Sequence, residues 1–121
     1  MTYQRKVARR VHELFAEYDV IESQWLAYGD RNGPGYAQPD VYVLTDHAIL
    51  CFEAKLTQCD AGALQIAQLY RPLLTRLYRR PVVGVLACRN IVFDVGNWLV
   101  RDPRTLLAED GNIYTWHYMG R

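Results

Sequence analysis

Apolar residues recur every three to four positions through the first eighteen residues of the chain, at Val7, Val11, Leu14, Phe15 and Tyr18. This spacing places them in one stripe, so the pattern predicts an amphipathic helix from about residue 3 to residue 18. The run 20–28 that follows is rich in β-forming residues and predicts a strand. The stretch 29–35 holds three glycines and a proline, which predicts a break in regular structure.

Two apolar runs separated by a short polar stretch predict a β-hairpin next. Its strands are 41–44 and 48–52, its turn is Thr45-Asp46-His47, and the second strand runs into Glu53. The strands are almost continuously apolar, which indicates a sheet covered on both faces.

A second helix is predicted from about Ala61 to Tyr78, because leucines and alanines recur there at helical spacing and Asp60 is a suitable N-cap. Pro72 lies inside this segment and should kink or interrupt it. A buried strand at 82–88 follows.

The last third of the chain predicts a short helix at 104–109 and a final strand at 113–119. Tyr114, Trp116 and Tyr118 share one face of that strand, and we expect them to pack in the core. The order of helix, strand, hairpin, helix and strand predicts an α/β (α+β) fold, with a mixed central β-sheet flanked by helices. At 121 residues the chain is expected to form a single domain.

Composition supports a cytoplasmic globular protein. Half of the residues are apolar and 22% are charged, no apolar run approaches the roughly 20 residues of a membrane span, and the polar N-terminus does not read as a secretory signal. Three cysteines are an odd number without paired spacing, which argues against a disulfide framework or a zinc knuckle. We expect all three to be reduced.

The net charge is only +1, but basic residues are clustered. They form one block in the first helix and another late in the second. Clustered arginines and lysines are either solvated helix faces or contacts to nucleic-acid phosphates. The candidate nucleic-acid-binding residues are Arg5, Lys6, Arg9, Arg10, Arg31, Arg76, Arg79 and Arg80.

Three charged residues around the predicted hairpin suggest chemistry. Asp40 opens its first strand, and Glu53 and Lys55 follow its second. Adjacent strands lie about 5 Å apart, and side chains two apart on a strand leave the same face, so the two carboxylates can share one cation beside the lysine. The alternative is that Glu53 and Lys55 form a solvated ion pair at a strand end.

The residues Pro39-Asp40 and Glu53-Ala54-Lys55, in this setting, resemble the PD-(D/E)XK nuclease superfamily. The resemblance covers about residues 3–88 and implies a restriction-endonuclease-like core. It implies that Asp40, Glu53 and the backbone carbonyl of Ala54 hold Mg²⁺, with Mn²⁺ as a substitute. Lys55 would orient the attacking water and stabilise developing negative charge. The extension 91–121 lies outside the resemblance.

Two further positions are implied by branches of this superfamily. The spacing of Glu13 from Asp40 resembles that of the first-helix acid in small archaeal Holliday-junction resolvases. Glu17 is the alternative, because it lies nearer the apolar stripe of the predicted helix. Gln65, or alternatively Gln68, resembles the helix glutamine of RecB-like and VRR-NUC nucleases. A tyrosine follows that glutamine by four residues in the RecB-like pattern, whereas Tyr70 follows Gln65 by five.

The resulting hypothesis is a magnesium-dependent DNA endonuclease that selects branched DNA, in the manner of a Holliday-junction resolvase. Cutting paired strands needs two symmetric sites, so a homodimer is implied. A VRR-NUC- or RecB-like nuclease acting on ends, flaps or single strands is the first alternative, and a catalytically inactive DNA-binding subunit is the second. The phosphate-binding glycine motifs of nucleotide cofactors are not found, and the small size suits a phage or mobile element active in DNA recombination or repair.

Overall fold

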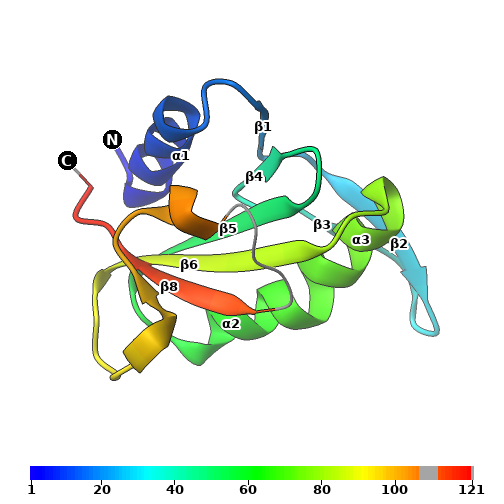
Figure 1. Cartoon of the computed structure of the whole chain (residues 1–121). Helices are drawn as coiled ribbons and strands as arrows, with labels where there is room; N and C mark the ends of the chain where they lie inside the picture. The colour runs from blue at the N-terminus through cyan, green and yellow to red at the C-terminus, as the bar shows by residue number, and fades with distance from the viewer. Residues whose placement is uncertain (107–111, 121) are drawn as a thin grey trace.

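The computed structural model describes residues 1–106 and 112–120 of the chain, so the second half of the predicted helix at 104–109 lies outside the described residues. A central sheet separates two helical layers (Figure 1). Helix α1 (Tyr3–Leu14) covers one face, and the helical segment from α2 (Asp60–Gln65) to α3 (Arg71–Tyr78) covers the other.

Six strands form the sheet in the order β1-β4-β5-β6-β8-β7. Strands β1, β4 and β5 pair antiparallel, whereas β5, β6, β8 and β7 pair parallel. Their bounds are Asp19–Glu22 (β1), Val41–Leu44 (β4), Ile49–Thr57 (β5), Val82–Asn90 (β6), Leu99–Val100 (β7) and Ile113–His117 (β8). The predicted mixed sheet flanked by helices is confirmed.

The core lies in two layers because buried strands alternate their side chains between the faces. Phe15, the residue that follows α1, packs against Phe52 and the residues around it, with ring centroids 6.0 Å apart. Tyr114 and Trp116 belong to the same layer, so the expected core role of these two aromatic residues is confirmed. The opposite layer collects Ile66, Tyr70 and Leu74 against the second face of the sheet.

Helix α1 begins and ends for local reasons. The side-chain hydroxyl of Thr2 accepts a hydrogen bond from the backbone N–H of Arg5 at 3.1 Å, which satisfies one of the free donors of the first turn. The helix ends at Leu14, about one turn earlier than predicted, because Phe15 leaves the helical conformation. Phe15 is nevertheless fully buried, so the predicted stripe continues beyond the helix.

The region 20–37 differs from the prediction. Ser23 has a positive φ of 50°, and this turn divides the predicted strand 20–28 into β1 and β2 (Leu26–Asp30). Strand β2 pairs antiparallel with β3 (Gly33–Ala37). The predicted break at 29–35 is therefore wrong, since this stretch contains the end of β2, the turn and the start of β3. The prediction failed here because glycine is a poor strand former and is read as a break in regular structure.

The second helix is interrupted, as Pro72 indicated. A π-helical turn, η1 (Ile66–Tyr70), joins α2 to α3, and the N–H of Arg71 bonds to the carbonyl of Ile66 five residues earlier. A proline ring clashes with the carbonyl four residues before it in a regular α-helix, and the wider turn ends just before Pro72. The buried positions of this segment, Gly62, Ile66, Tyr70 and Leu74, are four residues apart.

The C-terminal extension completes the sheet. Strand β8 pairs with β6, and the two-residue strand β7 forms the edge. Two short 3₁₀ turns, η2 (Gly96–Trp98) and η3 (Pro103–Leu106), connect β6 to β8 on the described part of the chain. Strands β7 and β8 of the C-terminal extension are thus part of the same sheet as the motif-bearing strands. Within the described residues, no helix is long and apolar enough to cross a membrane.

Candidate active site

Asp40 and Glu53 face each other across two antiparallel strands. Val41 pairs with Phe52 in the register of β4 and β5, so Asp40, one residue before β4, lies opposite Glu53. Side chains alternate along a strand, which directs Glu53 and Lys55 to the face covered by α2 and α3. The structure therefore brings Asp40, Glu53 and Lys55 together, and β5 continues to Thr57, so the motif lies inside this strand.

Both oxygens of the Asp40 carboxylate accept hydrogen bonds. Oδ2 accepts from the backbone N–H of Ala54 at 2.8 Å, and Oδ1 accepts from the side-chain amide of Gln4 in α1. Asp40 thereby connects the first helix to strand β5. These two donors fix the orientation of the carboxylate toward Glu53.

Glu53 is a buried acid, with only 4% of its surface exposed. Its Oε2 atom is buried without a hydrogen-bond partner among the described residues. Burial, together with hydrogen bonding and charge from the adjacent carboxyl group of Asp40, raises the pKa of Glu53 to about 9. The hydroxyl of Tyr70 and the charge of Lys55 act in the opposite direction on this pKa. A buried carboxylate with one unpartnered oxygen, next to a second carboxylate, is costly unless a cation joins the two.

Tyr70 positions the Glu53 side chain from the helical layer. It is the last residue of the π turn and is 2% exposed. Its hydroxyl donates a hydrogen bond to the carbonyl of Gln38 at 3.3 Å and also interacts with Glu53. Burial and the Glu53 charge raise the pKa of Tyr70, so this phenol stays protonated and remains a donor.

Lys55 is held against the first turn of α2. A Cβ atom built at Gly62 would lie 3.2 Å from Cγ of Lys55 and 2.6 Å from Cδ1 of Leu86. Gly62 therefore leaves the space that the stem of Lys55 occupies. The ammonium group lies near enough to Glu53 to lower its pKa, which places a positive charge beside the carboxylate pair.

The donor set of this group fits a hard divalent cation. Mg²⁺ is usually bound through one or two carboxylates and keeps several water ligands, and Asp40 and Glu53 supply two carboxylates. The unpartnered Oε2 of Glu53 is a free acceptor at this point. No group of three or more His, Cys, Asp or Glu side chains suited to a metal is found in residues 1–106 and 112–120, so water and backbone oxygens would complete the coordination.

Glu13 is not brought to this group. It lies in α1 nine residues beyond Gln4, which corresponds to about 13 Å along a helix axis. Its exposed carboxylate pairs with Arg10 at 3.0 Å and Arg9 at 3.9 Å. The α1 residue that contacts Asp40 is Gln4. The other acid considered, Glu17, pairs with Arg104.

Gln65 is the last residue of α2 and is partly buried. It lies three residues after Gly62, and residues three apart share a face of a helix. Since Gly62 abuts Lys55, Gln65 lies on the side of α2 that is turned toward the carboxylates, whereas Gln68 is exposed.

The predicted nucleic-acid-binding residues fall into separate groups. In α1, Arg5 pairs with Glu22, Arg9 and Arg10 pair with Glu13, and Lys6 is partly buried near Gly120. Arg31 is exposed at the turn between β2 and β3. Arg76 and Arg79 line a groove beside α3, and Arg80 donates a hydrogen bond to the carbonyl of Thr45 at 2.8 Å.

Sequence reasoning missed Gln4 and Gly62. Gln4 lies three residues before Val7 and therefore on the same side of α1 as the buried residues, although its own side chain is exposed. A polar side chain at this position was the available signal. Gly62 had no comparable signal, because its role depends on the approach of Lys55 from a strand.

Comparison with known proteins supports the fold. No family model matches the chain, and no curated protein sequence matches it. The fold is similar to the crystal structure of a repair endonuclease from Pyrococcus abyssi, with a TM-score of 0.55 and 17% sequence identity. The similarity covers 96% of this chain and 47% of that chain, so this chain spans about half the length of that protein. It establishes a shared fold.

Proposed function

We propose that the protein is a divalent-metal-dependent DNA nuclease that hydrolyses phosphodiester bonds at Asp40, Glu53 and Lys55. The observation that carries this proposal is the buried, unpartnered Oε2 of Glu53 beside the Asp40 carboxylate. The fold similarity to a repair endonuclease and the resemblance to the PD-(D/E)XK pattern support it.

Asp40 and Glu53 would hold the cation, and the carbonyl of Ala54 would contribute as the resemblance implies. When bound, the cation supplies Lewis acidity toward the phosphate and lowers the pKa of a water ligand. Gln4 and Tyr70 keep the two carboxyl groups in place through their hydrogen bonds. Outer partners of this kind preserve the orientation of ligands.

Lys55 stabilises negative charge that develops on the scissile phosphate. Its ammonium group lies next to Glu53, and its stem is confined by Gly62. Confinement matters because a preorganised cation stabilises a transition state without reorganising during the reaction. The complete set of Asp40, Glu53 and Lys55 argues against an inactive DNA-binding subunit.

The π turn favours a RecB-like or VRR-NUC-like nuclease over a junction resolvase. A π turn closes hydrogen bonds across five residues rather than four. In an α-helix, a tyrosine four residues after a glutamine lies one turn further along the same face. In the π turn, Tyr70 takes that position relative to Gln65 although it is five residues later. The five-residue spacing from Gln65 to Tyr70 is thereby equivalent to the four-residue spacing of that pattern. Glu13, the residue implied by the resolvase comparison, points instead to Arg9 and Arg10.

Cleavage assays test the proposal. We expect cleavage of a fluorescent DNA in Mg²⁺ or Mn²⁺ but not in EDTA. Asp40→Asn and Glu53→Gln should each lower the rate at least about 100-fold, and Lys55→Met should lower kcat by about 100-fold with little change in DNA affinity. Glu13→Gln is the matched control and should cleave like the wild type. Undiminished cleavage by Asp40→Asn would refute the site.

Substrate choice separates the two nuclease branches. Single strands, flaps, linear duplexes and four-way junctions of matched sequence would be compared. Symmetric cleavage of junctions requires a twofold dimer, whereas cleavage of flaps or single strands needs one site. Preference for flaps or single strands by a monomer supports the RecB-like branch, and preference for junctions by a dimer supports the resolvase branch.

A further inference from the structure

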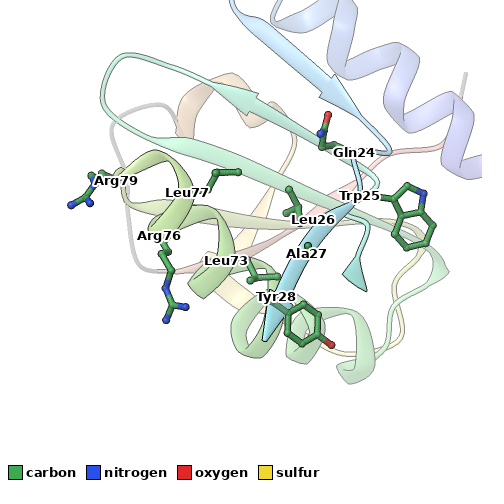
Figure 2. A pocket seen from close by; sticks show the side chains of 9 residues that line it. All are labelled: Gln24, Trp25, Leu26, Ala27, Tyr28, Leu73, Arg76, Leu77 and Arg79. Atoms are coloured by element: carbon green, nitrogen blue, oxygen red, sulfur yellow. The ribbon is translucent and has the colours of Figure 1, made fainter. Parts of the chain in front are cut away.

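A groove of about 550 Å³ lies between the β2–β3 ribbon and helix α3 (Figure 2), and its lining does not include Asp40 or Glu53. Its volume is within the range of ligand-binding pockets. Its walls come from the first strand of the ribbon and from the outer face of α3. The lining residues are Gln24, Trp25, Leu26, Ala27, Tyr28, Leu73, Arg76, Leu77 and Arg79.

The walls expose large apolar side chains that the fold does not bury. Trp25 is 63% exposed and Leu77 is 58% exposed. The ring of Tyr28 lies across Gly35 of the neighbouring strand, where an added Cβ would come within 2.6 Å of its hydroxyl oxygen. Gly35 thus allows the Tyr28 ring to lie against the ribbon, where it is partly buried and lines the groove.

Both charged side chains that line the groove are arginines. Arg76 and Arg79 are exposed and form no ion pair with any described residue. Figure 2 shows them on the α3 side, with Trp25 on the opposite side of the groove. The groove therefore combines aromatic and aliphatic walls with positive charge along one edge.

We propose that this groove binds an unpaired segment of a DNA strand, with bases on Trp25 and Tyr28 and phosphates near Arg76 and Arg79. Base stacking on aromatic side chains, combined with a positively charged edge, is how sequence-tolerant proteins bind single strands. A duplex hides the faces of its bases, so apolar walls of this kind match an unpaired strand. An apolar peptide would leave the two arginines without partners.

The groove is connected to the carboxylate pair by a short chain of hydrogen bonds. Trp25 is two residues beyond Ser23, whose N–H donates to the carbonyl of Asp40 at 3.0 Å. The side chain of Gln38 donates to the carbonyl of Ser23 at 2.8 Å, and the carbonyl of Gln38 accepts from Tyr70. These contacts fix the segment before Trp25 against the segment that carries Asp40. We propose that a strand bound in the groove extends to Asp40 and Glu53, and in this respect the inference rests on the proposed function.

The test measures binding without cleavage. The full-length protein in EDTA would be titrated against fluorescein-labelled oligo-dT of ten nucleotides and against a labelled duplex, with fluorescence anisotropy as the readout. Trp25→Ala and the double variant Arg76→Ala/Arg79→Ala should each weaken oligo-dT binding at least about fivefold. Gly35→Ala, which displaces the Tyr28 ring without removing it, should weaken the same binding and leave duplex binding unchanged.

Matched controls come from outside the groove. Trp98→Ala removes another exposed tryptophan, Arg101→Ala removes another exposed arginine, and both should bind oligo-dT like the wild type. The inference is overturned if the wild type does not bind oligo-dT, or if the groove variants bind it as tightly as the wild type. Because binding is measured in EDTA, a protein that binds through the groove but cleaves no DNA would refute only the proposed function.

Discussion

The side-chain amide of Gln4 donates a hydrogen bond to Oδ1 of Asp40, so the first helix holds one of the two candidate metal ligands. We predict that Gln4→Ala weakens metal affinity or cleavage by about 10- to 100-fold, the usual effect of removing a partner of a metal ligand. Metal dependence of the cleavage rate measures this. Gln24→Ala removes a glutamine of the groove and should leave the metal dependence unchanged. An equal metal dependence of Gln4→Ala and the wild type would show that Gln4 does not position Asp40.

Gly62→Ala tests the confinement of Lys55. The added methyl group would crowd Leu86 and the stem of Lys55, so we expect kcat to fall while the Kd for DNA changes little. Overpacking costs about 1–3 kcal/mol, and the better helix propensity of alanine offsets about 1 kcal/mol of it. Gly29→Ala is the matched control, because an added Cβ there contacts nothing within 4 Å. Unchanged kcat in Gly62→Ala would mean that Lys55 needs no confinement.

The metal-free protein should lose stability as pH rises from about 4.5 to about 9. Glu53 has an ordinary pKa of 4.5 but holds its proton to about pH 9 when folded. Across this window the unfolded chain releases the proton while the folded chain retains it, so rising pH favours unfolding. Below about 4.5 both states are protonated and the full contribution to stability is present.

Urea unfolding in EDTA across this pH window measures the effect. The free energy of unfolding of the wild type should decline relative to that of Glu53→Gln, by at most about 1.4 kcal/mol per pH unit for one proton. A difference between the two proteins that stays constant with pH would contradict the burial of an ionisable Glu53.

The sequence predicted the Asp40, Glu53 and Lys55 cluster because that cluster follows from local rules. Strand periodicity places Glu53 and Lys55 on one face, and a tight hairpin places Asp40 opposite Glu53. The contact between Gln4 and Asp40 joins residues 36 positions apart and depends on how α1 packs on the sheet. No rule of local spacing contains that information.

The places where the fold differs from the predicted elements also depend on packing between residues far apart in the sequence. Pro72 marked an irregularity in the second helix, but whether the chain kinks, breaks or widens there is decided by packing of Ile66, Tyr70 and Leu74 on the sheet. The sequence predicts a break at 29–35 because glycines are poor strand formers. The turn at Ser23 separates the ribbon from β1, and the sequence did not reveal the positive φ of that residue.

Calorimetric titration with Mn²⁺ tests the central claim most directly. We predict that the wild type binds Mn²⁺ through Asp40 and Glu53 and releases a proton from Glu53 near neutral pH, since carboxylate ligands bind metal in the deprotonated form. The released proton is measured by comparing two buffers of different ionisation enthalpy. Asp40→Asn and Glu53→Gln should lose this binding, and Glu13→Gln should retain it. Wild-type affinity in Asp40→Asn and Glu53→Gln would contradict the account.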